Sequence, residues 1–247
     1  MGRLTGAIKH LLIINILFFV ATSLYEVQML QWFSLWFPEN ENFALWQVIS
    51  HMFMHGGFMH ILFNMYALWA FGSPLEQMWG KNKFLFFYFS AGIGAAIIHT
   101  AVNYYYFTEG MDVLINSGLA KAEVMDIISQ GKFSPSWYNL APKSTIDNFL
   151  MAYSTPAVGA SGAIYGVLVA FGMSFPNSEL FLIFLPVPIK AKYFIPVLIG
   201  LDLFSGVTGY SIFGQGIAHF AHVGGALFGF IMMWYWKKRQ FNKNRWN

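Results

Sequence analysis

The sequence contains no cysteine and few charged residues. Only 10% of its 247 residues are Asp, Glu, Lys or Arg, whereas 57% are hydrophobic. Soluble domains carry about 25% charged residues, so this composition indicates a membrane protein. The absence of cysteine excludes disulfides, thiolate nucleophiles and cysteine-bound metal ions.

Six apolar stretches are long enough, or nearly so, to cross about 30 Å of hydrocarbon. They lie at about 8–28, 55–73, 84–107, 157–176, 191–208 and 218–236. Most are apolar on every face, as expected of helices surrounded by lipid and by other helices. We therefore predict an all-α membrane protein, a six-transmembrane helical bundle that forms one domain over residues 1–247 and has no internal repeat.

The basic residues predict the orientation of this bundle. All but three of the 14 Lys and Arg residues fall on one side of the predicted spans. The other three, Lys121, Lys132 and Lys143, lie in one long loop at about 108–156. By the positive-inside rule both termini are cytoplasmic, that is, N-in and C-in. Because the asymmetry is a topology signal, we expect no nucleic-acid partner.

Residues 28–50 are expected to form a membrane-associated first loop. The segment is rich in Trp and Phe yet contains Pro38, Glu39 and Glu41. It is too polar to cross the bilayer and too aromatic to remain in water. Amphipathic rings of this kind settle at the outer interface of the membrane.

Two other segments are not expected to span. Residues 108–156 are interpreted as a long polar outer loop, in which Leu119 to Gln130 could form a short helix that ends at Gly131. Glu179 to Ile189 is apolar but is interrupted by two prolines. We interpret this second segment as an interfacial turn on the cytoplasmic side.

Polar side chains from three predicted spans fall at the same depth. The second, fourth and sixth spans run from outside to inside, so their first turns share the outer leaflet. Ser161 and His222 each lie about four residues into their spans, and His60 and Asn64 lie one helical turn apart in the second. Membrane interiors seldom hold ionisable groups that have no function, so these residues are predicted to form one site.

The chemistry of this set is that of a serine hydrolase. A serine hydroxyl is a poor nucleophile until a neighbouring base takes its proton, and neutral imidazole is such a base. An Asn amide and a second His can stabilise the oxyanion formed by attack on a carbonyl. Since Glu26 and Asp202 are assigned to other parts of the bundle, a Ser-His dyad is predicted, with Tyr165 stacking on the imidazole of His222.

These residues stand in motifs that resemble the rhomboid intramembrane serine proteases. The motifs are Gly159-Ala160-Ser161-Gly162 with Tyr165 one turn on, Ala221-His222-Val223-Gly224-Gly225, and His60-Ile61-Leu62-Phe63-Asn64. Their order, their spacing and the six predicted spans resemble the basic bacterial form of that family over about residues 8–236. The resemblance implies Ser161 as nucleophile and His222 as general base and acid. It also implies an oxyanion hole formed by His60, Asn64 and the backbone amide of Ser161.

The resemblance carries further expectations. It implies a gate formed by the fifth span and the following loop, at about Gly206–Gly216, and a structural role for Glu76. Gln47 stands where the family often has Arg, so the sequence leaves undecided whether this position anchors the first loop. No cofactor is implied. The simplest location is the cytoplasmic membrane of a bacterium, and the membrane of an organelle is the alternative.

Simpler interpretations exist for several of these residues. Gly159, Gly162, Gly224 and Gly225 could serve close helix packing alone. We expect Gly224, Gly225 and Gly229 to let the sixth span press against the fourth, which would bring His222 to Ser161. A weaker alternative is a metal site formed by the histidines of this region, since no acidic residue is expected among them. These histidines are His51, His55, His60, His219 and His222. No metal is therefore predicted.

The predicted function is that of an intramembrane serine endopeptidase. Its partners are the lipid bilayer and transmembrane protein substrates, which it would cut near the outer face. One alternative is a catalytically silent rhomboid-like protein that binds membrane helices, although such relatives usually lack the Ser or His that this chain keeps. The other is a small membrane transporter, which the lack of repeat symmetry and of a central line of charges disfavours.

Overall fold

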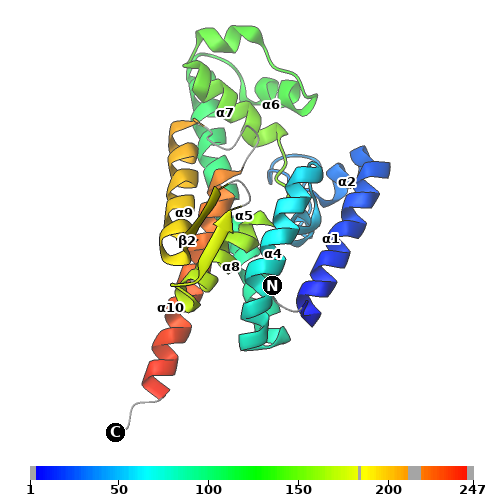
Figure 1. The fold of residues 1–247 in the computed structure, drawn as a ribbon. Helices are drawn as coiled ribbons and strands as arrows, with labels where there is room; N and C mark the ends of the chain where they lie inside the picture. Colours follow the sequence, from blue (N-terminus) through cyan, green and yellow to red (C-terminus); the bar gives the residue numbers. More distant parts are fainter. Residues whose placement is uncertain (1–3, 183–184, 211–217, 244–247) are drawn as a thin grey trace.

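The computed structural model describes residues 4–182, 185–210 and 218–243, and each predicted span coincides with a helix in it. Successive helices of the bundle run in alternating directions (Figure 1). Their bounds are α1 Gly6–Leu24, α4 Phe58–Trp79, α5 Lys81–Asn116, α8 Ser161–Ser174, α9 Ala191–Thr208 and α10 His219–Lys243.

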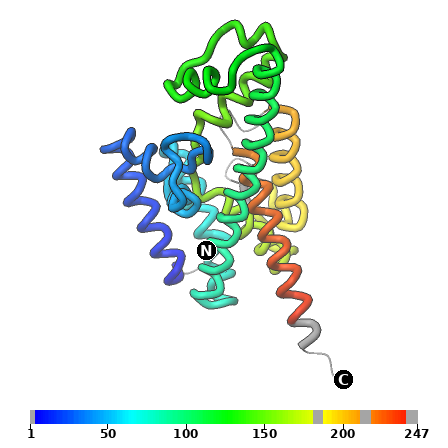
Figure 2. The backbone as a smooth tube through the Cα atoms, turned by 180° about the vertical axis from the view of Figure 1, so that it is seen from behind, coloured from blue at the N-terminus to red at the C-terminus, as the bar shows by residue number. Residues whose placement is uncertain are grey.

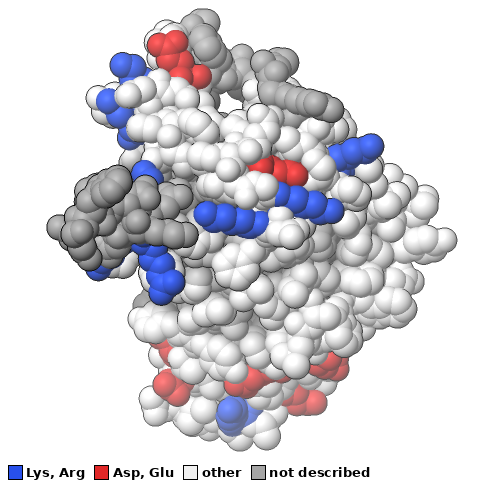
Figure 3. All heavy atoms as spheres, turned by 90° about the horizontal axis from the view of Figure 1, so that it is seen from below, with Lys and Arg blue, Asp and Glu red and all other residues white. Residues whose placement is uncertain are grey.

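Length and composition identify membrane-spanning candidates among these helices. Helices α1, α5 and α9 are each long and apolar enough to cross a membrane, and α8 is a shorter apolar helix. Large apolar side chains such as Leu17 and Val197 are exposed on the outside of the bundle. Viewed from below, most of the visible surface carries no charge, and the Lys and Arg side chains are scattered over it (Figure 3). The exposed apolar side chains along the outside of the helices suit a lipid environment.

Helix α8 lies at the centre of the bundle. Every residue from Gly162 to Phe171 is buried, so the helix has no lipid-facing stripe over this length. A helix that is apolar on all sides and packed on all sides occupies the core. Helices α4, α5, α9 and α10 surround it. Ser161, the first residue of α8, is therefore placed inside the protein.

The first loop is anchored by Gln47. It contains α2 (Glu26–Phe33), α3 (Gln47–Ser50) and a 3-10 turn at His51–Phe53. The Gln47 side chain is fully buried, accepts hydrogen bonds from the backbone N–H groups of Trp36 and Ala44, and donates one to the carbonyl of Asn42 at 2.8 Å. Gln47 thus ties the loop together at the position where the family often has an arginine.

The long outer loop is a folded cap. Helix α5 continues to Asn116, beyond the predicted end of the third span at 107, so its 36 residues extend about 54 Å. It is followed by α6 (Lys121–Ser129), a 3-10 turn (Pro135–Asn139) and α7 (Lys143–Ser154). These elements share a second hydrophobic core that includes Leu114, Val124, Trp137, Ile146 and Phe149. The cap lies above the bundle in both views (Figures 1 and 2).

The structure corrects the prediction of a purely α-helical chain. The segment interpreted as an interfacial turn forms a β-hairpin, in which β1 (Glu179–Leu182) pairs antiparallel with β2 (Leu185–Lys190). Glu179 lies opposite Lys190 in this pairing. Proline lacks the backbone N–H that a helix or a central strand needs, but either strand of a two-stranded sheet is an edge strand, where Pro186 and Pro188 are tolerated.

Candidate active site

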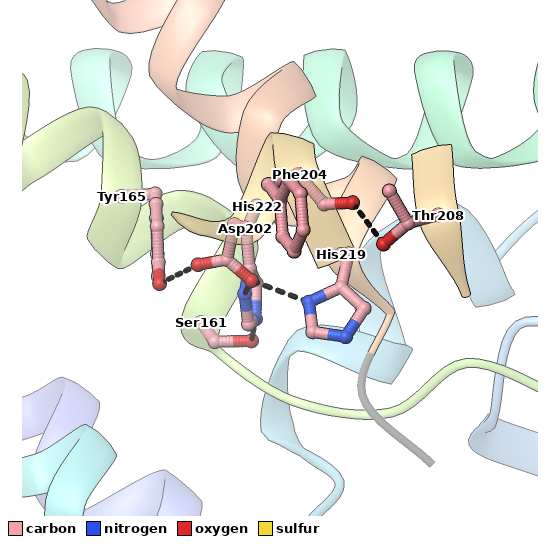
Figure 4. Close-up of polar contacts among 7 residues, drawn as sticks. All are labelled: Ser161, Tyr165, Asp202, Phe204, Thr208, His219 and His222. Carbon is pink, nitrogen blue, oxygen red and sulfur yellow. Dashed lines mark hydrogen bonds and ion pairs between the residues drawn. The ribbon is translucent and has the colours of Figure 1, made fainter. Parts of the chain in front are cut away.

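The first turns of α8 and α10 bring Ser161 and His222 into hydrogen-bonding contact. The Nε2 atom of His222 lies 2.8 Å from the Oγ atom of Ser161 (Figure 4). Both side chains are only partly buried. The contact joins residues 61 positions apart in the sequence, so it depends on the packing of the two helices.

Glycines permit this packing. A methyl group at Gly225 would lie 1.8 Å from the carbonyl oxygen of Gly162, and one at Gly229 would lie 2.6 Å from the Cα atom of Gly166. The backbones of α8 and α10 are therefore closer than any side chain would allow. The expectation that Gly224 packs against the fourth span is wrong. A methyl group at Gly224 would point toward α5 and lie 2.7 Å from the Cβ atom of Ile98.

Tyr165 lies one turn after Ser161 and covers the imidazole. Its ring is stacked on that of His222, with the centroids 4.3 Å apart and the planes at 13°. Tyr165 is buried in the main hydrophobic core. The stack fixes the plane of the imidazole against the central helix.

The expectation that no acidic residue lies near His222 is wrong. The Oδ1 atom of Asp202 lies 3.1 Å from His222 Nδ1 and 2.6 Å from His219 Nδ1, and Oδ2 accepts a hydrogen bond from the Tyr165 hydroxyl (Figure 4). Asp202 is 1% exposed. Helix α9 runs opposite to α8 and α10, so the depth of its residues must be counted back from its C-terminal end at Thr208. That count would have placed Asp202 level with Ser161.

His60 and Gly159 lie on the other side of Ser161. A methyl group at Gly159 would lie 2.9 Å from His60 Nε2 and 3.4 Å from Ser161 Oγ, so both atoms border the space above this glycine. Asn64, one turn further along α4, is buried. Its amide makes no hydrogen bond to any residue that the structure describes, so it remains able to donate to a ligand.

His51 connects the first loop to the site. Its Nδ1 atom lies 2.8 Å from the carbonyl oxygen of Gln47, and its own carbonyl accepts a hydrogen bond from the backbone N–H of Gly159 at 2.9 Å. Burial lowers the pKa of the His51 imidazole to about 4, so the ring is neutral at pH 7. A cavity of about 20 Å³ lies between His51, His99 and Ser161, which is room for one water molecule.

The structure also bears on the metal alternative. Asp202, His219 and His222 each offer a ligand atom, and these atoms lie within 4.8 Å of one another, so an acidic residue does join histidines here. However, the separations of 2.6 and 3.1 Å between the carboxylate and the two Nδ1 atoms are those of direct hydrogen bonds. Of the predicted gate at Gly206–Gly216, residues 211–216 lie outside the described part of the chain.

The fold and the site together define an integral membrane protein with a Ser-His pair inside a bundle of apolar helices. The family model of the rhomboid domain matches residues 42–239. This match covers most of the chain, which therefore belongs to the rhomboid family.

Three relatives illustrate the similarity to known proteins. The chain is 29% identical over 212 residues to the presenilin-associated rhomboid-like protein A, mitochondrial, of Danio rerio, covering 82% of this chain and 42% of the relative. It is 28% identical over 194 residues to the presenilin-associated rhomboid-like protein, mitochondrial, of Homo sapiens. This match covers 76% of this chain and 38% of the relative. It is 28% identical over 191 residues to the rhomboid protein 1, mitochondrial, of Saccharomyces cerevisiae. This match covers 77% of this chain and 42% of the relative.

The relatives show how much of a longer protein this chain matches, and their names give a cellular location for them. The chain spans about two fifths of the length of the curated relatives it matches. The names of these relatives place them in mitochondria, which contradicts the expectation of a bacterial cytoplasmic membrane. The assignment as an integral membrane protein is unaffected.

Proposed function

We propose that this protein is an intramembrane serine endopeptidase in which Ser161 is the nucleophile and His222 the general base. The observation that carries the proposal is the 2.8 Å contact between His222 Nε2 and Ser161 Oγ within a bundle of apolar helices. Membership of the rhomboid family supports it. In this proposal all six helices of the bundle cross the bilayer, with both termini on the cytoplasmic side.

The first chemical step would be acylation of Ser161. Its Oγ attacks the carbonyl carbon of the scissile peptide while His222 Nε2 takes the hydroxyl proton. His222 then returns this proton to the nitrogen of the leaving amine. A water molecule, deprotonated in turn by His222, hydrolyses the acyl-enzyme and regenerates the Ser161 hydroxyl. The cavity beside His51 and Ser161 has room for this water.

Three donors could stabilise the oxyanion. Ser161 is the first residue of α8, so its backbone N–H has no acceptor within the helix. His60 Nε2 borders the space above Gly159 on the same side as Ser161 Oγ. The buried amide of Asn64 is the third donor. Removing one donor of this kind typically reduces kcat by about 10²–10³-fold.

The proposed substrates are transmembrane segments of other proteins, cut near the outer face of the bilayer. Ser161 is the first residue of α8, the helix that follows the last helix of the cap along the chain. An α-helix keeps its carbonyl groups in internal hydrogen bonds, so the substrate must unwind where it is cut. Small or helix-breaking residues are expected there, with a small side chain before the scissile bond.

The test is cleavage of a model single-pass substrate by the purified protein in detergent. Wild type should cut the substrate, and Ser161→Ala and His222→Ala should lose cleavage while remaining folded. Matched controls are Ser23→Ala and His10→Ala, since both side chains are exposed and bond only a carbonyl in the preceding turn of α1. Undiminished cleavage by Ser161→Ala or His222→Ala contradicts the proposal. No cleavage by wild type favours a silent, helix-binding protein.

A further inference from the structure

Asp202 completes the hydrogen-bonded chain that starts at Ser161, and we propose that it is a positioning residue for His222. Its carboxylate holds the proton of the neutral imidazole on Nδ1, so that Nε2 presents a lone pair to the Ser161 hydroxyl. It also faces the imidazolium formed when His222 accepts the serine proton. This inference rests on the proposed function and concerns the same site.

The hydrogen-bond inventory of the carboxylate supports the assignment. An ionised carboxylate can only accept hydrogen bonds, so each of its three neighbours must donate. The Tyr165 hydroxyl donates to Oδ2, and the Nδ1–H groups of His219 and His222 donate to Oδ1. With its proton on Nδ1, the His222 ring has its lone pair on Nε2, which lies 2.8 Å from Ser161 Oγ.

The burial of Asp202 indicates why these donors matter. A carboxylate that is 1% exposed inside an apolar bundle has lost its hydration, and hydrogen bonds from the protein must replace it. Two of the three donors come from the first turn of α10, and the third comes from α8. The carboxylate is therefore directed at the Ser-His pair and not at lipid.

A purely structural role is the alternative. Among the residues of α9, all of which the structure describes, only Ala191, Ile195, Asp202 and Ser205 are buried. Asp202 could therefore serve only to fasten α9 to the bundle. Close packing of α9 on α10 has a second source, because a methyl group at Gly206 would lie 3.1 Å from the Phe220 ring and 3.3 Å from the Cβ atom of His219.

The two roles predict different effects of Asp202→Leu, which removes the acceptor and keeps the branched shape of the side chain. If Asp202 positions His222, kcat falls by about 10²–10⁴-fold, KM changes little, and the labelling of Ser161 by a fluorophosphonate slows in parallel. The Tm falls as well, because three buried donors lose their acceptor, so the positioning role is read from kcat per folded molecule and from the labelling rate. Asp202→Asn keeps the size of the side chain but can donate its amide N–H to His222 Nδ1, which favours the Nε2–H tautomer, so it should also lose activity strongly.

Ser205→Ala is the matched control, since Ser205 lies one turn further along α9 and is equally buried. It should keep the wild-type kcat. Wild-type kcat and labelling rate in Asp202→Leu, or a lower Tm with unchanged kcat, overturn the positioning role. If Ser161→Ala is inactive in the same assay, this outcome leaves the proposed peptidase function intact. Activity in Ser161→Ala would instead contradict that function.

A spectroscopic measurement on the wild type tests the positioning role even if the variants of Asp202 do not fold. Nitrogen NMR of histidine-labelled protein, with the His222 signals assigned by their loss in His222→Gln, reports which ring nitrogen carries the proton. The expected form of neutral His222 is protonated on Nδ1, whereas the Nε2–H form overturns the proposal. His219, His60 and His99 are the other imidazoles near or electrostatically coupled to His222, so their signals are assigned in the same way.

Discussion

Gly159 separates His60 from Ser161, and its backbone has a conformation that other residues rarely adopt. Its φ angle is +125°, and a methyl group there would lie 2.9 Å from His60 Nε2. Both the strain and the contact would displace the turn that leads into α8. The space above this glycine is also where the proposed oxyanion would form. Gly159 is thus required by the local structure and by the proposed chemistry together.

Gly159→Ala is therefore expected to reduce cleavage strongly. A side chain in such a backbone conformation costs about 1–3 kcal/mol, which lowers Tm as well. The measurement is the cleavage rate per folded molecule together with the Tm. Gly200→Ala is the control, because a methyl group there meets no described residue within 4 Å. Equal cleavage rates in the two variants would contradict this role of Gly159.

The titration of the His51 imidazole is expected to make the stability of the protein depend on pH. Burial lowers the pKa of its imidazole from 6.5 to about 4 in the folded protein. Between these values only the unfolded chain binds the proton, so His51 lowers the free energy of unfolding as the pH falls from about 6.5 to 4, by up to about 3 kcal/mol. Above pH 6.5 the ring is neutral in both states and this loss is absent.

His51→Gln should therefore show a smaller decrease in Tm between pH 7 and pH 4.5 than the wild type. Glutamine can still donate to the Gln47 carbonyl but does not titrate. The measurement is thermal unfolding in detergent at both pH values. His10→Gln, at an exposed position, should behave as the wild type. The same decrease in His51→Gln and in the wild type would contradict the prediction.

Among the single residues of the site, those near the first residue of a helix could be predicted. Ser161 and His222 each lie near the start of a helix, so counting inward from the start of the span gave their common depth. Asp202 lies on a helix that runs the opposite way, and its partners are unrelated to its neighbours in the sequence. The direction of Gly224 toward α5 depends on the rotation of α10, which the sequence pattern does not specify.

At the scale of elements, α1 is held by the side chain of Glu76 on α4. The Thr5 hydroxyl and the backbone N–H groups of Ala7 and Ile8 all donate to its carboxylate, the last two at 2.7 and 3.0 Å. These N–H groups belong to the first turn of α1 and have no acceptor within the helix. Glu76 thus caps one helix from another.

Glu76→Ala leaves these three donors without their acceptor. We expect the Tm to fall by an amount equivalent to about 2–4 kcal/mol, and hydrogen exchange to increase in the first turn of α1. Gln77→Ala, at the adjacent exposed position, should match the wild type. Cleavage per folded molecule should be unchanged, because Glu76 lies far from Ser161 along the bundle. A wild-type Tm in Glu76→Ala would contradict the capping role.

Elements with a strong apolar pattern could be predicted, and the others could not. The predicted span at 191–208 coincides with α9, and the short helix expected after Leu119 is α6. The extension of α5 and the folding of α7 against it depend on a core shared by distant segments, which single-segment patterns do not reveal. The β-hairpin was missed because its prolines suggested only an interruption.

At the scale of the whole molecule, the arrangement follows from close packing at the centre. Helix α8 is buried on all sides, and α10 approaches it through glycines. This approach places the imidazole of His222 against Ser161, and α9 adds the carboxylate of Asp202. A polar cluster is thereby assembled from three helices within an apolar bundle. Only the part of this cluster that lies at helix starts could be predicted from the sequence.

The reactivity of Ser161 toward a fluorophosphonate tests the central claim most directly. Only a serine activated by a neighbouring base reacts readily with such a probe. Mass spectrometry of the digested wild-type protein should find one adduct, on the peptide that contains Ser161. The adduct should be absent in Ser161→Ala and greatly slowed in His222→Ala. No adduct in the wild type, or undiminished labelling in Ser161→Ala, would contradict the account.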